Sequence, residues 1–271
     1  MRLLVSSVRT TTNCDRTHTM DVHIRHHLIL QSLQELGEVQ VSSLASELDC
    51  SEMTIRRDLE SLEGLGGLRR VHGGAVSLYL SAEEAPFDIR ALENMEAKTA
   101  IAAIAVDLLV EGETVILDGG STTMEVARSM RQRRLTVMPL ALRPVLELDC
   151  CQGIKLLLPG GEVRTKELSL VGSLSEHAFS QLRFDTFIMG ICGIDVVAGV
   201  TTQMLAEADV KRAAAKAARR VIAVADASKI GRVAFGHVCD IADIDILVTD
   251  ASADDVIVNE LIEAGVDVRR A

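Results

Sequence analysis

The stretch SEMTIRRDLESLEGLGGLRRVHGGA, residues 51–75, decides how the N-terminal part of this chain folds. Ile55, Leu59 and Leu62 are spaced by four and then three residues, which places them on one face of a helix. Ser51 is a suitable N-cap for this helix, and the glycines that follow end it. The next residues alternate apolar and cationic side chains before a His-Gly-Gly turn. The stretch therefore predicts an amphipathic helix followed by a small two-stranded ribbon.

Two pairs of arginines decorate this unit. Arg57 points away from the apolar face and Arg56 lies on its flank, while Arg69 and Arg70 lie on the ribbon. A guanidinium is a planar fork that can bond guanine or phosphate at two points. The layout favours a winged helix-turn-helix, with the helix in the major groove and the ribbon as the wing. The alternative is a helical hairpin whose Arg56 and Arg57 only pair with Asp58 and Glu60 at the surface.

The residues before this stretch supply the other helices of such a domain. Residues 22–36 predict a first helix, a short extended link follows, and residues 43–48 predict a second, shorter helix. Helix, short helix, turn and recognition helix then follow in the order that the motif requires, which favours DNA binding over the hairpin. On the first helix, the spacing predicts an inward face made of Ile24, Leu28, Leu33 and Leu36.

The string from residue 42 to residue 76 closely resembles the DNA-binding domain of the DeoR family of bacterial transcriptional regulators. The family pattern is a Ser, then Thr-Ile-Arg-Arg-Asp-Leu, then Arg-x-His-Gly-Gly-Ala, and it stands here at residues 51, 54–59 and 70–75. The resemblance implies that Thr54, Arg56 and Arg57 are the main contacts to double-stranded operator DNA. The complete predicted DNA-binding set is Ser51, Thr54, Arg56, Arg57, Arg69, Arg70 and His72.

Charge and composition indicate how this domain would bind DNA. The formal net charge is −11, aromatic residues make up 2% of the chain and tryptophan is absent, so a stacking platform for single strands is not expected. Residues 21–77 contain five arginines and nine acidic residues, a net charge of −4, but four of those arginines lie between positions 56 and 70. We therefore expect a few well-aimed contacts and a dimer or tetramer that presents paired recognition helices, rather than bulk attraction to DNA.

The remaining compositional signals concern compartment and ligands. The six cysteines form no CxxC pair, and no histidine cluster completes a zinc pattern, so we expect reduced thiols, no metal and no cofactor. No apolar run reaches the roughly 18 residues of a membrane span, which predicts a cytoplasmic protein without a membrane partner. Residues 1–20 lack the apolar core of a signal peptide and are expected to be a disordered leader.

After a DNA-binding domain at 21–76 and a linker at 77–90, residues 91–271 show a second architecture. Short apolar strands alternate with helices, which predicts an α/β domain of Rossmann-like type, a mostly parallel sheet covered on both faces. Ligands of such sheets bind at the carboxyl ends of the strands. The predicted strands are 114–117, 135–138, 155–158, 184–189, 221–225 and 246–249.

Polar and glycine residues gather at these strand ends. The segment 118–123 (DGGSTT) follows a strand and opens a helix, so its backbone amides and hydroxyls suit a phosphate, although Ser121 or Thr122 could simply cap the helix. Asp195 could bond sugar hydroxyls or cap a turn, and Lys211 could neutralise phosphate or lie on a solvated helix face. The predicted effector-binding set is Asp118, Gly119, Gly120, Ser121, Thr122, Thr123, Gly160, Gly161, Gly193, Asp195, Thr201, Lys211 and Lys229.

From about residue 87 to its end the chain also resembles the DeoR-family sensor domain, which is related in fold to ribose-5-phosphate isomerase. The matching pieces are 118–123, 158–162, 171–172, 193–195, 199–202, 210–212 and 226–231. The resemblance implies that a phosphorylated sugar or related metabolite binds here and alters operator affinity. Many family members have a Thr-Asn pair after the second strand, where this chain has Met138-Pro139-Leu140-Ala141. We therefore expect one polar ligand contact fewer.

Three functions fit this sequence. The leading interpretation is a transcriptional repressor of sugar-metabolism genes that a sugar phosphate releases from its operator. An aldose–ketose isomerase is the second, because Asp195 or Glu207 could act as the carboxylate base that this chemistry needs. An activator with the same architecture is the third. The leading interpretation assigns no catalytic residues.

Overall fold

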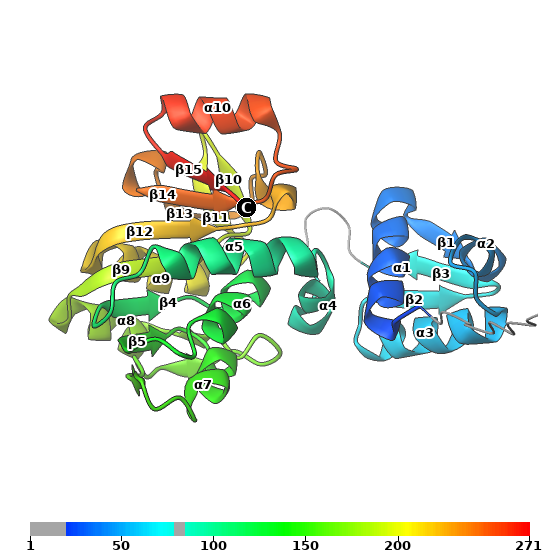
Figure 1. Cartoon of the computed structure of the whole chain (residues 1–271), viewed down its shortest axis with the longest axis horizontal. Coiled ribbons are helices and arrows are strands. Elements are labelled where there is room, and N and C mark those ends of the chain that lie inside the picture. Colours follow the sequence, from blue (N-terminus) through cyan, green and yellow to red (C-terminus); the bar gives the residue numbers. More distant parts are fainter. Residues whose placement is uncertain (1–19, 79–84) are drawn as a thin grey trace, which may run out of the picture.

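The computed structural model of this chain describes residues 20–78 and 85–271. Cys14 and residues 1–19 of the expected leader lie outside the described residues, as does the middle of the expected linker. The N-terminal elements are α1 (Val22–Leu36), β1 (Glu38–Gln40), α2 (Val41–Glu47), α3 (Glu52–Gly64), β2 (Leu68–Val71) and β3 (Gly74–Ser77). They form the compact helical unit drawn in blue and cyan in Figure 1.

The N-terminal unit is a winged helix-turn-helix. The recognition helix is α3, and β2 and β3 form the expected antiparallel wing around the His72-Gly73 turn. The segment expected to be only an extended link contributes a third strand, because β1 pairs with β3 in the order β1-β3-β2. The wing is thereby joined directly to the chain between the first two helices.

The apolar face of α3 is confirmed, and that of α1 needs a correction. Ile55, Leu59 and Leu62 are all at most 1% exposed. On α1, however, Ile24 is 56% exposed and Leu36 is 70% exposed, so neither points inward as expected. Leu33 is buried as expected and Leu28 is half-buried, and Ile29 and Leu30 complete the buried apolar face of α1. The helix is rotated because its inward face also carries Arg25 and His26, which are buried against α3.

The C-terminal unit contains a seven-stranded sheet in which every pair of neighbouring strands is parallel, in the order β15-β14-β12-β9-β4-β5-β6. Its strands are β4 (Thr114–Leu117), β5 (Leu135–Pro139), β6 (Ile154–Leu156), β9 (Phe184–Gly190), β12 (Ala218–Val224), β14 (Ile246–Thr249) and β15 (Asp267–Arg270). The helices are α4 (Phe87–Leu92), α5 (Met95–Asp107), α6 (Ser121–Ser129), α7 (Leu142–Leu148), α8 (Ser173–Gln181), α9 (Leu205–Ala217) and α10 (Asp255–Glu263).

Alternate residues of the central strands enter two separate apolar layers. Val115 and Leu117 of β4 pack with the residues of α5 and α6. Ile116, between them, packs on the opposite face with residues of α8, α9 and α10. The parallel sheet is therefore covered on both faces, as its continuous apolar strands predict.

Several short elements were not expected from the sequence. Segments 193–195 and 199–202, expected at the ends of the parallel strands, are β10 (Gly193–Asp195) and β11 (Gly199–Thr202) of a separate antiparallel sheet with β13 (Gly236–Cys239). A hairpin of β7 (Glu162–Val163) and β8 (Leu170–Val171) lies beside α9. Residues 87–90, assigned to the linker, begin helix α4. These segments are short and lack the continuous apolar runs that marked the strands of the central sheet, so the apolar pattern does not reveal them.

Candidate functional site

The recognition helix exposes both of its arginines. Ser51 caps α3 by accepting a hydrogen bond from the Thr54 amide at 3.1 Å, as predicted. Arg56 and Arg57 are exposed, and Arg56 donates to Glu52 one turn earlier at 2.7 Å. Such exposed pairs contribute little stability and exchange readily for another anion. The outer face of α3 can therefore offer two guanidinium groups to a duplex.

The wing adds a second cationic surface beside the helix. Arg69, Arg70 and His72 are all exposed on β2 and its turn. The Arg70 guanidinium donates to Glu63 at 2.9 Å, which ties the wing to the end of α3. A groove between helix and wing is lined by Arg56 and Arg70 together with Val41, Leu59, Val71, Gly73 and Gly74. The predicted DNA-binding residues thus lie on two adjoining elements.

Asp58 is not a surface partner of the neighbouring arginines, as the hairpin alternative supposed. It is 5% exposed and turns toward α1, where Arg25 donates to its two oxygens at 2.5 and 3.0 Å. His26 lies 3.2 Å from the same carboxylate through Nε2. The hydrogen bond with Asp58 raises the pKa of Arg25 further above its ordinary value. A bidentate pair of this kind fixes the relative orientation of its two side chains, so it holds α3 at a defined angle to α1.

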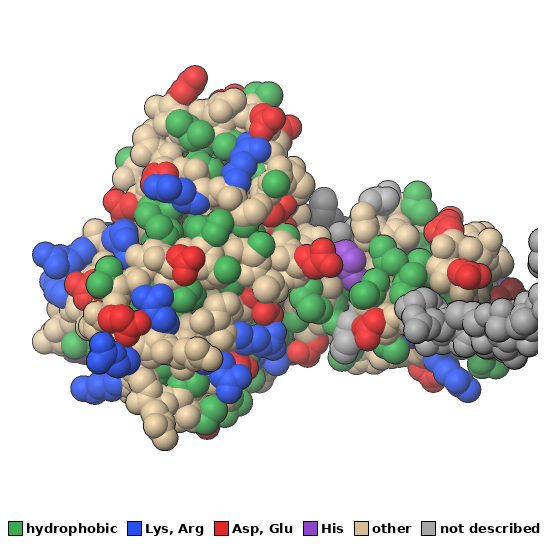
Figure 2. All heavy atoms as spheres, viewed as in Figure 1, with side chains coloured by type: hydrophobic (Ala, Val, Ile, Leu, Met, Phe, Trp, Pro, Cys, Tyr) green, Lys and Arg blue, Asp and Glu red, His purple; other side chains and the backbone are tan. Residues whose placement is uncertain are grey.

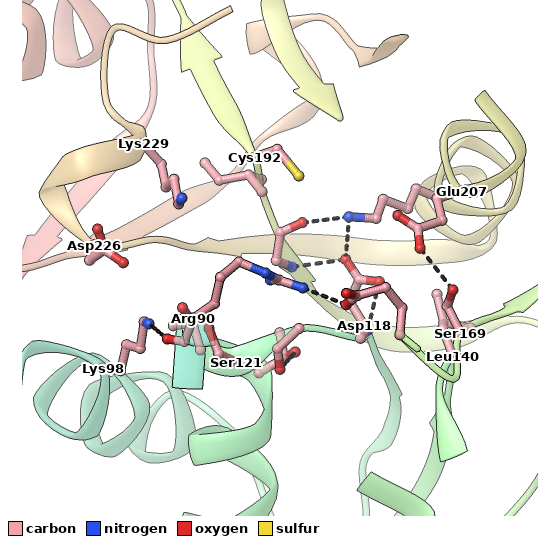
Figure 3. A pocket seen from close by; sticks show the side chains of 18 of the residues that line it. Arg90, Lys98, Asp118, Ser121, Leu140, Ser169, Cys192, Glu207, Asp226 and Lys229 are labelled. Atoms are coloured by element: carbon pink, nitrogen blue, oxygen red, sulfur yellow. Dashed lines mark hydrogen bonds and ion pairs between the residues drawn. The ribbon is translucent and has the colours of Figure 1, made fainter. Parts of the chain in front are cut away.

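A cavity opens at the carboxyl ends of the parallel strands, where β4 leads into α6 (Figure 3). The whole segment 118–123 lines it. Gly120 has a φ of 120°, a conformation that L-amino-acid side chains rarely adopt, so a glycine is required at the turn into α6. The first turn of α6 follows at once with Ser121, which is buried at the cavity wall. The segment has the position of an anion cradle.

Asp118 and Lys211 form a buried ion pair at the floor of the cavity. The Lys211 ammonium lies 2.8 Å from the Asp118 carboxylate and donates to the Gly190 carbonyl, also at 2.8 Å. The same carboxylate accepts hydrogen bonds from the amides of Gly119 and Gly190. Burial raises the pKa of Asp118, an effect that Lys211 and the Gly119 amide oppose. These contacts lock the ends of β4 and β9 to α9 and give the cavity a rigid base.

Three further cations reach the cavity from separate elements. Figure 3 shows Arg90, Lys98 and Lys229 on one side of it, with Asp226 beside them. Lys98 is 3% exposed, and its ammonium donates to the backbone carbonyls of Arg90 and Glu93. Burial lowers the pKa of Lys98 to about 8, although Asp226 and Glu93 act in the opposite direction. The Lys229 ammonium makes no hydrogen bond or ion pair within the described residues.

The structure brings together some of the predicted effector residues and separates others. Segment 118–123, Lys211 and Lys229 all line the cavity. Asp195 does not, because its carboxylate accepts from the amides of Val197 and Ala198 and so caps the β10–β11 turn. Gly160, Gly161, Gly193 and Thr201 also lie outside the lining. Their roles are local: the Gly160 carbonyl accepts from Ser175, Gly161 packs against Ser175, Gly193 lies against the Arg232 carbonyl and Thr201 donates to Gly193.

Sequence reasoning missed the other half of the site. Arg90, Glu93, Lys98 and Glu167 line the cavity but come from the expected linker, the two helices after it and a hairpin turn. Their only sequence signal is that Arg90 and Lys98 are basic residues beside the first buried helix of the domain. Leu140 lines the opposite side, together with Glu207 and Ser169, so the Met138–Ala141 segment does present an apolar wall to the cavity (Figure 3).

Comparison with known proteins places both units in one family. Residues 25–79 match the DeoR-like helix-turn-helix domain, and residues 93–251 match the DeoR C terminal sensor domain.

The chain belongs to the DeoR family.

Relatives of this DeoR-family regulator align over nearly their whole length. The transcriptional regulator GlpR of Haloferax volcanii is 35% identical over 90% of this chain and 96% of its own. The putative aga operon transcriptional repressor of Escherichia coli O157:H7 is 35% identical over 90% of this chain and 92% of its own. Among solved structures, ribose 5-phosphate isomerase A from Methanocaldococcus jannaschii aligns over only 50% of this chain and 54% of its own, at 15% identity and with a TM-score of 0.38.

Three further observations bear on the partners and ligands of the protein. Among the described residues of this DeoR-family protein, no helix is long and apolar enough to cross a membrane. Within the same residues, no group of three His, Cys, Asp or Glu side chains is placed to hold a metal ion. On the face seen in Figure 2, basic and acidic side chains are intermixed over the sensor domain rather than gathered by sign. The face in view therefore offers no broad basic surface for DNA.

Proposed function

We propose that this regulator represses sugar-metabolism genes and that a phosphorylated sugar, bound in the sensor cavity, lowers its affinity for the operator. The observation that carries the proposal is the convergence of Arg90, Lys98 and Lys229 on one cavity beside the 118–123 segment. Three cations from separate elements, beside free helix N-terminal amides, suit an oxyanion. Support also comes from a 31% identical relative named the glycerol-3-phosphate regulon repressor, from E. coli K12.

The proposal includes an oligomeric assembly and a regulatory rather than an enzymatic role. Two recognition helices on paired half-sites require at least a dimer. An isomerase needs a free carboxylate base in the cavity. Of the two carboxylates that the sequence suggested for this role, Asp195 lies outside the cavity, and Glu207 is already bound by Arg164 and by Ser169, the latter at 2.8 Å. One relative, 31% identical, is named the L-fucose operon activator. Whether this regulator represses or activates its genes is therefore tested with a reporter-gene assay.

The test uses the full-length protein and a duplex that it selects from a random-sequence library. A panel of phosphorylated sugars is screened for release of that duplex by fluorescence anisotropy, and each is assayed in parallel for turnover. We expect one compound to weaken duplex binding about tenfold to a hundredfold without being converted. Turnover without release would favour the isomerase, and no effect from any phosphorylated sugar would contradict the proposed ligand class.

Lys229→Met should make the regulator insensitive to that compound. The ammonium reaches the cavity and has no ion-pair partner among the described residues, so its loss removes attraction for the effector without leaving a buried charge behind. We expect the effector concentration for half-maximal release to rise about tenfold to a hundredfold, as for loss of one charge-assisted contact. Affinity for the duplex itself should be unchanged. Lys155→Met, an exposed lysine on β6 outside the cavity lining, serves as the matched control.

The low pKa of Lys98 predicts a pH dependence of anion binding. Below pH 8 the Lys98 ammonium is charged and attracts an anion. Above pH 8 the side chain loses its proton when no anion is bound. Burial is the main cause of the low pKa, and the charged groups that face the ammonium are Asp226, Glu93, Lys229 and Arg90. Sulfate is a suitable probe because its charge is constant above pH 6. Sulfate affinity should be level from pH 6.5 to 7.5 and then fall by up to about tenfold per unit. Calorimetry should show this fall absent in Lys98→Met.

A further inference from the structure

Helix α4 belongs to both units of the protein. Figure 1 shows it between the parallel-sheet domain and α1. Ile89 is 1% exposed and packs in the apolar core of the DNA-binding domain, so close to the chain that a Cβ on Gly67 would lie 2.5 Å from its Cδ1. The next residue, Arg90, is 9% exposed and lines the effector cavity. Two consecutive side chains therefore connect the two sites.

Glu167 holds α4 against the sensor domain with both oxygens of its carboxylate. One oxygen accepts a hydrogen bond from the Phe87 amide at 3.2 Å, at the first residue of α4. The other forms an ion pair with the Arg90 guanidinium, and the two side chains are only 15% and 11% exposed. Arg143 stacks on the Phe87 ring, 4.1 Å from its centre, and completes the clamp. The position of α4 thus depends directly on where Glu167 lies.

The turn that carries Glu167 is strained. Lys166 and Leu168, its two neighbours, have φ values of 73° and 59°, in the left-handed region that L-amino-acid residues avoid. The turn connects β7 and β8 and is closed by backbone hydrogen bonds between residues 164, 168 and 169. A strained turn persists only where its contacts hold it, and the contacts of Glu167 with α4 are among them. The turn can therefore move when those contacts are exchanged.

We propose that Glu167 is an internal anion that competes with the effector for Arg90, and that its displacement releases α4 and so disturbs the DNA-binding domain through Ile89. The inference rests on the proposed function, since it concerns the effector's own cavity. An anionic effector and Glu167 would share one guanidinium in a largely buried space, where like charges repel strongly. The arrangement in which Glu167 holds α4 is then the one that binds the operator.

The first test measures binding of inorganic phosphate to the full-length protein by calorimetry at pH 7.5. Glu167→Gln removes the competing charge and keeps the size of the side chain, and Glu167→Ala removes both contacts to α4. Both variants should bind phosphate about tenfold more tightly than the unchanged protein, because a nearby like charge is gone. Glu162→Gln, an exposed carboxylate on the adjacent strand β7, should leave phosphate affinity unchanged.

The second test follows α4 itself. Because the Phe87 amide donates to Glu167, saturating phosphate should increase its hydrogen-exchange rate at least about tenfold in the unchanged protein. In Glu167→Ala this amide should exchange rapidly without phosphate. The same variant, still folded by circular dichroism, should bind the selected duplex more weakly in the absence of any anion. Retention of full duplex affinity in Glu167→Ala would contradict the coupling.

The outcomes separate this inference from the proposed function. Equal phosphate affinity in the unchanged protein and both Glu167 variants overturns the competition and leaves the effector cavity standing. Binding of phosphate to none of the three overturns both. Tighter binding in the variants, together with faster exchange at Phe87, supports both, and tighter binding with an unchanged Phe87 amide overturns the release of α4.

Discussion

Replacing Arg56 and Arg57 together by alanine should weaken binding of the selected duplex by about thirtyfold to twenty-thousandfold. Each arginine that reads a base edge contributes about 1–3 kcal/mol, and both are exposed on the outer face of α3. Neither side chain supports the fold, because the buried face of the helix is made by Ile55, Leu59 and Leu62. Fluorescence anisotropy at fixed salt gives the loss, and circular dichroism confirms that the domain remains folded.

The two single variants should differ. Arg56 must give up its 2.7 Å pair with Glu52 before it can contact DNA, whereas Arg57 makes no hydrogen bond or ion pair in the described part of the chain. We therefore expect Arg57→Ala to cost more affinity than Arg56→Ala. Arg219→Ala, an exposed arginine at the start of β12 in the sensor domain, is the matched control. Wild-type affinity in the double variant would show that α3 does not read the operator.

The second large effect concerns the stability of the sensor domain. Asp118→Leu should lower the free energy of unfolding by about 3–5 kcal/mol, because it leaves the Lys211 ammonium buried without its partner. The Asp118 and Lys211 side chains are only 5% and 8% exposed, so little solvent reaches the ammonium that is left behind. Lys211→Met should have a loss of the same order, since it leaves the Asp118 carboxylate unpaired. Urea unfolding followed by circular dichroism measures both.

The double variant tests whether the loss of stability comes from an unpaired buried charge. Asp118→Leu combined with Lys211→Met removes both charges at once and should recover much of the stability lost in either single variant. If the losses instead add, the two residues stabilise the domain independently and the ion pair is not the cause. Glu125→Leu, a mostly buried acid of α6 whose partner Arg128 is half exposed, controls for the loss of a carboxylate in general, and it should cost far less.

The sequence predicted those parts of the molecule that repeat or match a motif. The α3 face of Ile55, Leu59 and Leu62, the Ser51 cap and strands such as Thr114–Leu117 follow from local periodicity, and all are present. The position of the 118–123 segment follows from the rule that parallel strands end at one edge of a sheet. Local pattern and tertiary structure agree at these positions.

What failed depended on contacts between distant residues. Arg25 and His26 turn inward because each contacts Asp58, which lies 33 and 32 residues later in the chain. The spacing of apolar residues does not predict such a polar contact. Arg90 and Lys98 reach the cavity because α4 and the first turn of α5 lie beside the segment that follows β4. Asp195 was assigned to the ligand because a turn cap and a sugar-binding carboxylate look alike in a sequence. Polar partnership over long separations decides these cases, and hydrophobic periodicity does not report it.

The double attachment of α4 limits how this regulator can be recombined with its relatives. In a hybrid protein joined after residue 90, Ile89 and Gly67 would come from the same parent. Arg90, however, would face a β7–β8 hairpin from the other parent. A hybrid protein joined before residue 85 would keep Arg90 with Glu167. Ile89 would then have to pack in the core of a helix-turn-helix domain from the other parent. Engineers who exchange sensors to build new metabolite-responsive switches should therefore transplant α4 with the Gly67 surface that receives it.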